Sequence, residues 1–175
     1  DECFNDFLTD GARHTLKARL ADYSKLVILR AYTKMYAVPG VRFGWCMTSN
    51  TDLIEGLYRA GQPWNVSVIA QACAAAAAGE AEYAAQTAAR IAQERAYLTE
   101  ELTRRRLTVY PGEANFLLFR SADSELRDKL ATCGVLIRSC ANYCGLGAGY
   151  YRTAVKARED TTRLLAALDS IQEGY

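Results

Sequence analysis

The sequence is poor in the residue types that build metal centres and membrane-spanning segments. It has a single histidine, His14, and none of its six cysteines belongs to a Cys-x-x-Cys pair, so no metal site is expected. No apolar run approaches the length of a helix that crosses a bilayer. The chain begins Asp1-Glu2 without a signal peptide, and reduced thiols in a chain of this kind predict a cytoplasmic location.

Neither sign of charge is in excess. The chain has 21 Lys and Arg against 20 Asp and Glu, a net charge of +1, so neither nucleic acid nor a membrane surface is an expected partner. Half of the 175 residues are hydrophobic, which is enough for the core of one domain or of two small ones. A start on an acidic pair instead of methionine predicts a fragment or a processed product.

The most informative stretch surrounds Lys34. A strand-like run over 25–32 leads into Thr33-Lys34, a Pro39-Gly40 turn follows, and Arg42 stands eight residues after the lysine. Desolvation or a neighbouring cation lowers the pKa of a lysine and frees its amine for nucleophilic attack. A guanidinium binds two oxygens of a phosphate at once, and a threonine hydroxyl can add a third donor. A lone lysine and arginine beside a turn are more often surface residues, so the pair alone does not decide.

The whole run over 29–45 resembles the cofactor-lysine segment of the fold-type I enzymes that use pyridoxal phosphate (PLP), within the branch of histidinol-phosphate aminotransferases and threonine-phosphate decarboxylases. The resemblance implies that Lys34 is the Schiff-base lysine and that Thr33 and Arg42 hold the cofactor phosphate. It also implies that Asp1 pairs with the pyridine nitrogen of PLP. Many relatives carry a tyrosine where this chain has Phe4, and phenylalanine favours the decarboxylase side.

A second motif covers 135–155 and contains Gly145-Leu146-Gly147. The glycines do not suggest a dinucleotide loop, because a strand rather than a helix follows them. This stretch resembles the substrate-recognition segment of the threonine-phosphate decarboxylases. The resemblance implies that Arg152 binds the substrate carboxylate, that Arg138 contacts its phosphate or carboxylate, and that Asn115 lies near the site. Taken singly, each arginine would be a surface or interface residue, and Asn115 could equally be a turn or strand-end residue.

The predicted fold class is α/β. Residues 1–79 are expected to be the remainder of the large PLP-binding domain, 80–106 a bridging helix, and 107–175 a small α+β domain whose helices cover one face of a mostly antiparallel sheet. Thr51-Asp52 is expected to cap a helix. Trp64 could pack in a core or lie near the active-site entrance and a dimer contact. The expected helices cover 12–23, 53–59, 67–78, 80–106, 124–131 and 158–171, and the expected strands cover 26–32, 41–47, 108–110, 115–119, 135–138 and 151–154.

The resemblance extends over the whole chain but only over the second half of a family member. The chain is therefore expected to supply part of a site, and such sites are usually built in a homodimer. The expected activity is PLP-dependent L-threonine-O-3-phosphate decarboxylation, a step of cobalamin biosynthesis. Histidinol-phosphate aminotransfer, or a related class I/II aminotransfer, is the alternative, and an inactive isolated C-terminal fragment is a further one. The substrate would be a small phosphorylated amino acid.

Overall fold

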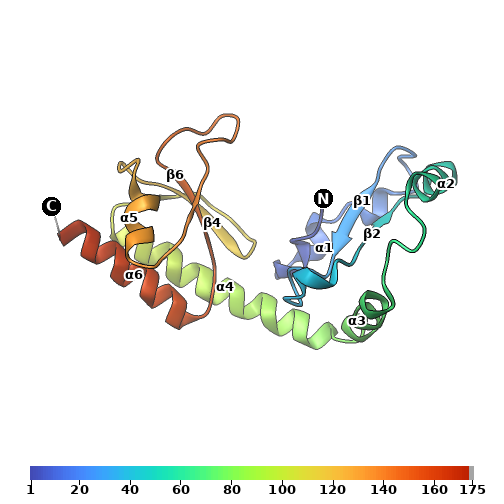
Figure 1. The fold of residues 1–175 in the computed structure, drawn as a ribbon, viewed down its shortest axis with the longest axis horizontal. Helices are drawn as coiled ribbons and strands as arrows, with labels where there is room; N and C mark the ends of the chain where they lie inside the picture. Colours follow the sequence, from blue (N-terminus) through green and yellow to red (C-terminus); the bar gives the residue numbers. More distant parts are fainter. Residues whose placement is uncertain (174–175) are drawn as a thin grey trace. The chain divides into compact units, whose positions relative to one another are not determined.

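The computed structural model describes residues 1–173 and divides into two compact units, Asp1–Ala88 and Ala89–Tyr175 (Figure 1). The boundary lies inside the longest helix, α4 (Ala81–Arg104), which covers most of the expected bridging segment. Within residues 1–173, no helix combines the length and the apolar character that crossing a membrane requires. The same residues contain no group of three or more His, Cys, Asp or Glu side chains placed to hold a metal ion.

The first unit is built on a two-stranded antiparallel sheet. Strand β1 (Ile28–Ala31) pairs with β2 (Gly44–Met47), from Ile28 opposite Met47 to Ala31 opposite Gly44. A Cβ atom at Gly44 would lie 3.0 Å from the backbone oxygen of Arg30, so the close approach of the two strands at this point favours glycine.

The helix expected over 12–23 is wrong. The chain instead forms a four-residue helix, α1 (Gly11–His14), and a 3₁₀ turn, η2 (Lys17–Arg19). The side chain of Glu2 accounts for the break, because its carboxylate accepts hydrogen bonds from the Thr15 hydroxyl (2.8 Å) and from the Leu16 backbone N–H (2.9 Å). The Leu16 N–H thus has a hydrogen-bond acceptor without a helix. This local bond competes with helix formation beyond His14.

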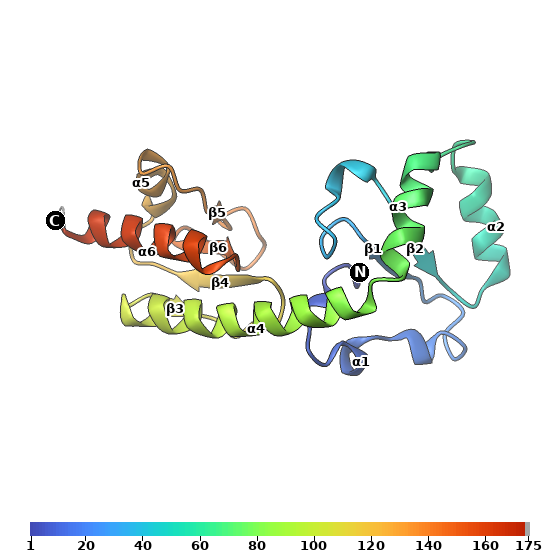
Figure 2. The same ribbon diagram turned by 90° about the horizontal axis from the view of Figure 1, so that it is seen from below.

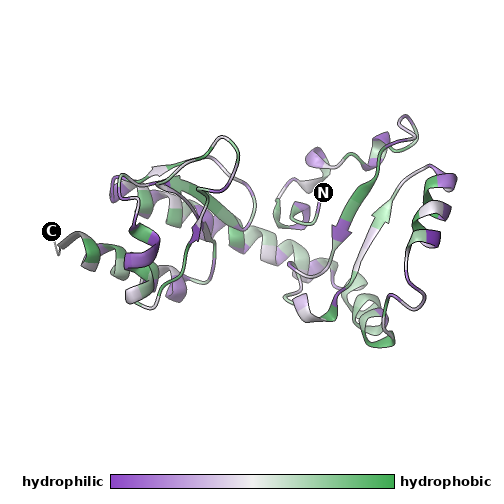
Figure 3. Cartoon of the chain, turned by 45° about the horizontal axis from the view of Figure 1, so that its top comes forward, coloured by the Kyte–Doolittle hydropathy of each residue, from purple (hydrophilic) through white to green (hydrophobic). Residues whose placement is uncertain are grey.

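Two further helices complete the first unit, α2 (Thr51–Ala60) and α3 (Val68–Ala78). Asn50 caps α2 by accepting from the Leu53 N–H at 3.1 Å, so the cap lies one residue before the expected Thr51-Asp52 pair. Ser67 caps α3 in the same way. Figure 3 shows α3 as mainly hydrophobic, whereas α2 mixes both kinds of residue.

The second unit is a four-stranded antiparallel sheet with helices on one side, as expected for a small α+β layer (Figure 2). The strand order is β3-β4-β6-β5, and every pairing is antiparallel. The strand expected over 135–138 is displaced, because only Arg138 and Ser139 pair with β6. The elements are β3 (Thr108–Val109), β4 (Phe116–Arg120), α5 (Leu126–Thr132), β5 (Arg138–Ser139), β6 (Tyr150–Ala154) and α6 (Arg158–Glu173).

The core of this unit lies between the sheet and the helices. Alternate residues of the two central strands, among them Leu117, Phe119 and Tyr151, are almost fully buried against helical leucines. Two ion pairs join α4 and the turn that follows it to α6. Arg158 contacts Glu94 at 2.9 Å, and Arg105 contacts Asp169 at 2.6 Å. The remaining face of the sheet therefore carries the other set of alternating residues, including Arg152.

Candidate cofactor and substrate residues

The loop that connects β1 to β2 carries three of the predicted cofactor residues. Its base is closed by the pairing of the two strands and by the stacked rings of Tyr32 and Phe43, whose centroids are 5.8 Å apart. Thr33 follows Tyr32 and Arg42 precedes Phe43. The fold therefore brings the two residues predicted to bind the phosphate to the same end of this loop, and Lys34 follows Thr33 there.

A buried neighbour anchors Lys34. The Met35 side chain is only 2% exposed, whereas Lys34 is exposed to solvent. The Tyr36 N–H donates to the Tyr32 oxygen and the Ala37 N–H to the Lys34 oxygen, both at 3.2 Å, which fixes the turn. No acidic side chain among residues 1–173 forms an ion pair with Lys34, so its amine is available to a ligand.

Arg42 lies in a strained backbone conformation. Its φ of 60° is left-handed, as is the φ of 51° at Ala37, and the two residues flank the 3₁₀ turn η3 (Pro39–Val41). The Arg42 guanidinium donates to the Pro39 oxygen at 2.8 Å, which tightens the turn. A left-handed non-glycine residue costs about 1–2 kcal/mol, and such strain gathers at functional sites. The expected Pro-Gly reversal is thus present, with the left-handed conformation at Arg42.

Asp1 is exposed and is held by short-range contacts. Its carboxylate accepts from the Cys3 N–H at 2.8 Å. The next residue ties this segment to β1, because the Glu2 N–H donates to the Leu29 oxygen at 2.8 Å. Asp1 and Lys34 are therefore both connected to the same strand, Asp1 through the hydrogen bond of its neighbour Glu2 and Lys34 through the C-terminal continuation of the strand.

A cluster of aromatic rings beside the lysine turn was missed by the sequence analysis. The Tyr32 ring lies 4.6 Å from Trp45, and Tyr36 stacks on Tyr83 of α4 at 5.7 Å. Burial raises the pKa of the Tyr36 phenol, and Tyr32, Asp6, Glu80 and Tyr83 add to the shift. The signal available in the sequence was the repetition of aromatic residues around Lys34, but Tyr83 lies too far along the chain for that pattern to include it.

In the second unit, the two predicted substrate arginines lie directly opposite each other. Arg138 of β5 pairs in register with Arg152 of β6. Arg152 also stacks its guanidinium over the Phe116 ring, 4.9 Å from its centroid. Cross-strand neighbours share a face of a sheet, so both arginines lie on the face opposite the buried core residues. Like charges placed directly opposite destabilise a sheet, and a bound anion would relieve that repulsion.

Asn115 immediately precedes β4, and its backbone oxygen accepts from the Val155 N–H at 2.8 Å. Its side-chain oxygen Oδ1 is buried and has no hydrogen-bond partner among the described residues. A buried acceptor without a donor costs about 1–3 kcal/mol. The atom therefore provides an acceptor for a donor from outside the described chain, and the residue has a strand-end position as well.

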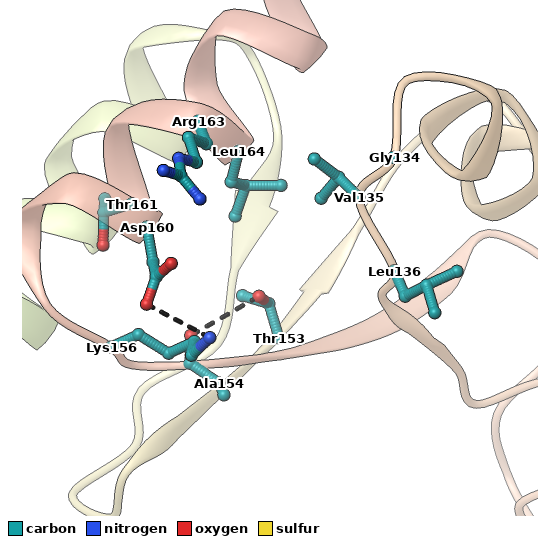
Figure 4. A pocket seen from close by; sticks show the side chains of 10 residues that line it. All are labelled: Gly134, Val135, Leu136, Thr153, Ala154, Lys156, Asp160, Thr161, Arg163 and Leu164. Carbon is teal, nitrogen blue, oxygen red and sulfur yellow. Dashed lines mark hydrogen bonds and ion pairs between the residues drawn. The ribbon is translucent and has the colours of Figure 1, made fainter.

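A separate pocket of about 210 Å³ lies between α6, the end of β6 and the segment before β5 (Figure 4). Its lining includes Lys156, which pairs with Asp160 at 3.1 Å, and the exposed Leu136. None of the predicted site residues lines it. Both cations of this pocket already have acidic partners, since Arg163 pairs with Glu159 at 2.8 Å, so the pocket lacks the free charge that a phosphorylated substrate requires.

Known proteins resemble this chain over almost its whole length. The model of the family "Aminotransferase class I and II" matches residues 1–171. The threonine-phosphate decarboxylase of Salmonella typhimurium is 36% identical, over 99% of this chain and 48% of its own length.

Solved structures give the same result. The histidinol-phosphate aminotransferase of Clostridium acetobutylicum superposes with a TM-score of 0.93 at 30% identity, covering 100% of this chain and 54% of that protein. The histidinol-phosphate aminotransferase of Sinorhizobium meliloti, solved in complex with pyridoxal-5'-phosphate, shares the fold with a TM-score of 0.80 at 17% identity, covering 99% of this chain and 48% of that protein. The chain spans about half the length of these relatives. The predicted family and mixed α/β fold are confirmed, and the chain belongs to the aminotransferase class I and II family.

Proposed function

We propose that this chain supplies the C-terminal half of a PLP-dependent enzyme that acts on a phosphorylated amino acid. The proposed reaction is the decarboxylation of L-threonine-O-3-phosphate in cobalamin biosynthesis. The observation that best supports this reaction is that Arg138 and Arg152 lie directly opposite each other on the open face of the sheet of the second unit. A substrate with both a carboxylate and a phosphate provides one anionic group for each guanidinium.

The residues of the first unit suit the cofactor. Lys34 presents an exposed amine that has no acidic partner within residues 1–173, on a turn anchored by the buried Met35. Thr33 and Arg42 offer a hydroxyl and a guanidinium at the base of the loop between β1 and β2, and Asp1 offers a carboxylate for the pyridine nitrogen. PLP, when bound, withdraws electrons from the α-carbon of an amino acid.

In this proposal the chain binds, orients and moves protons. Arg152 and Arg138 fix the direction of the substrate, and this direction decides which bond at the α-carbon is aligned for cleavage. Lys34 Nζ would hold the cofactor and, as a free amine, would accept or donate the proton at that carbon. The same residues can serve decarboxylation or aminotransfer, so the orientation imposed by the two arginines separates the two reactions.

Histidinol-phosphate aminotransfer is the second candidate. The identity of 36% to a threonine-phosphate decarboxylase, against 33% to a histidinol-phosphate aminotransferase, supports the decarboxylase. Phe4 favours it too, since the phenylalanine lacks the hydroxyl expected in many aminotransferases at this place. An enzyme supplied with L-threonine-O-3-phosphate should release carbon dioxide. Amino-group exchange between a phosphorylated amine and 2-oxoglutarate would instead establish the aminotransferase.

The surface of the first unit supports a homodimer. Trp64 is 97% exposed, and its backbone φ of 59° is left-handed, so packing in the core of this unit is excluded. Tyr58, Val68 and Ile69 are also exposed, and exposed apolar side chains of this size mark interaction surfaces. All six cysteines are free thiols, which suits the reducing cytoplasm.

The deciding experiment is incubation with PLP, reduction with borohydride, and peptide mapping. The proposal predicts one adduct, on Lys34, and its loss in Lys34→Ala. Lys25→Ala is the matched control, because Lys25 is also an exposed lysine of the first unit and should leave the adduct unchanged. Adducts spread over several surface lysines would overturn the assignment of Lys34. A full-length protein without any adduct would identify an inactive relative.

A further inference from the structure

An ion pair joins the N-terminal segment of the first unit to the strand that leads to Lys34. The Arg30 guanidinium donates through Nη2 to Asp6 Oδ1. Both side chains are largely covered, with exposed fractions of 20% for Arg30 and 28% for Asp6. Arg30 lies four residues before Lys34, and Asp6 lies five residues after Asp1. The pair therefore connects the two segments that carry the proposed cofactor residues.

The pair is poorly arranged for stability alone. Arg30 Nε is buried and, within the described part of the chain, has no hydrogen-bond partner. Desolvating a guanidinium whose donors are only partly satisfied offsets much of the attraction between the two charges. Replacing such a pair by apolar residues of similar volume is often neutral or stabilising. Stability therefore does not explain why this position has a charged pair.

The position of Arg30 in the sheet explains the charged pair better than stability does. Arg30 pairs in register with Trp45, and Trp45 contacts Tyr32 at 4.6 Å, so the arginine adjoins the aromatic cluster beside the lysine turn. The neighbouring Leu29 oxygen accepts the Glu2 N–H. Two consecutive residues of β1 thus contact the N-terminal segment, one through its backbone and one through its side chain.

We propose that the Asp6–Arg30 ion pair is a positioning device that fixes the segment bearing Asp1 against the strand that leads to Lys34. The inference rests on the proposed function for the roles of Asp1 and Lys34. The backbone hydrogen bond between Glu2 and Leu29 sets the distance between the two segments, and the ion pair restricts the turning of the N-terminal segment about that bond. Neither Asp6 nor Arg30 is a catalytic residue in this scheme.

Amide hydrogen exchange, measured by NMR on the protein without cofactor, tests the coupling. Three amides report on it: Glu2, bonded to the Leu29 oxygen, and Tyr36 and Ala37 in the lysine turn. In the double variant Asp6→Leu/Arg30→Met we expect all three to exchange about tenfold faster, while the thermal midpoint changes by no more than a few degrees. Arg30→Lys, which keeps the charge, should recover part of the protection.

Lys129→Met is the matched control. Lys129 pairs with Asp123 at 2.8 Å with exposed fractions of 26% and 30%, close to those of Asp6 and Arg30, but it lies in the second unit. It should leave the three reporter amides unchanged. Equal acceleration at amides throughout the first unit of the double variant would show a general loss of stability and overturn the proposal. Unchanged protection at all three reporters would also overturn it.

A second readout uses PLP itself. The double variant should bind PLP about tenfold more weakly than the unchanged protein, and its visible absorption maximum should shift because Asp1 no longer meets the pyridine nitrogen in a fixed position. Failure of the unchanged protein to form an adduct at Lys34 would overturn the proposed function. The exchange experiment needs no cofactor and decides the coupling independently, so the two failures are distinguishable.

Discussion

Arg138 and Arg152 lie directly opposite each other in the ladder between β5 and β6, on the face of the sheet that is not covered by helices. Two guanidinium groups in this arrangement repel each other, although Arg152 also stacks over the Phe116 ring. The proposed ligand with two negative groups would relieve this repulsion, and the two arginines are therefore the first targets for mutation.

Replacing either arginine should separate stability from substrate binding. Removal of one of two opposed like charges in Arg138→Gln or Arg152→Gln is expected to leave the free energy of unfolding unchanged or raise it by about 0.2–1 kcal/mol. The same change should also lower kcat/KM for a phosphorylated amino acid, mainly by raising KM. The reason is the loss of charge-assisted binding worth about 2 kcal/mol or more. Urea unfolding and steady-state kinetics measure the two effects.

Arg120→Gln is the matched control for this prediction. Arg120 pairs in register with Tyr150 and stacks over its ring at 5.5 Å, on the same face as the two arginines. Arg120→Gln should change KM far less than Arg138→Gln or Arg152→Gln does. An equal effect at all three positions would indicate a general electrostatic field rather than two specific contacts.

The core of the second unit should be sensitive to the loss of Leu130. Its side chain is 0% exposed, so Leu130→Ala leaves a cavity and should lower the free energy of unfolding by about 2–5 kcal/mol. Leu136→Ala, at a side chain that is 80% exposed, is the control and should change it by no more than about 0.5 kcal/mol. Similar losses in chemical denaturation would contradict the assigned core.

Gly149 should not tolerate a side chain. Its φ is +87°, and an added Cβ would lie 2.6 Å from the Ser121 backbone oxygen, beside the bond from the Ser121 N–H to the Gly149 oxygen. Gly149→Ala is expected to lower the free energy of unfolding by about 2 kcal/mol or more. Gly147→Ala, where no other atom of the described residues lies within 4 Å of the added Cβ, should be nearly neutral. Thermal denaturation of the two variants makes the comparison.

The ion pair between Arg105 and Asp169 should make stability depend on pH. The Arg105 guanidinium donates to both oxygens of Asp169, at 2.6 and 2.7 Å, and this hydrogen bonding lowers the pKa of the carboxyl below 3.8 in the folded protein. The stabilisation is thus complete at a pH above the unfolded value and is lost as the pH falls through the folded value. Because Asp169 is 46% exposed, we expect no more than about 1 kcal/mol.

The measurement is a pH series of thermal midpoints for the unchanged protein and for Asp169→Asn. The difference between them should be constant from neutral pH to about pH 5 and should shrink below a pH of about 3.8. Asp128→Asn is the control, because that carboxylate is 78% exposed and lies 3.8 Å from Arg127. A difference that grew toward low pH would contradict the assigned ion pair.

The long elements of the fold were predictable from local pattern. The apolar positions of residues 80–106 repeat with helical periodicity, and α4 (Ala81–Arg104) begins and ends within two residues of the predicted bounds. The shorter elements were not. The β-branched and aliphatic run from Val135 predicted a strand there, but pairing with β6 begins only at Arg138, and Leu136 stays exposed. Pairing depends on a partner strand, which composition does not reveal.

The sequence by itself determined the family and the antiparallel α+β character of the second unit, and its resemblance to that family predicted the cofactor and substrate residues. Only the tertiary structure placed Arg138 opposite Arg152, joined Asp6 to Arg30, and stacked Tyr83 on Tyr36. Each of these relationships links residues that are distant in the chain. Such contacts follow from strand register and from the packing of whole elements, whereas a sequence motif records only neighbours along the chain.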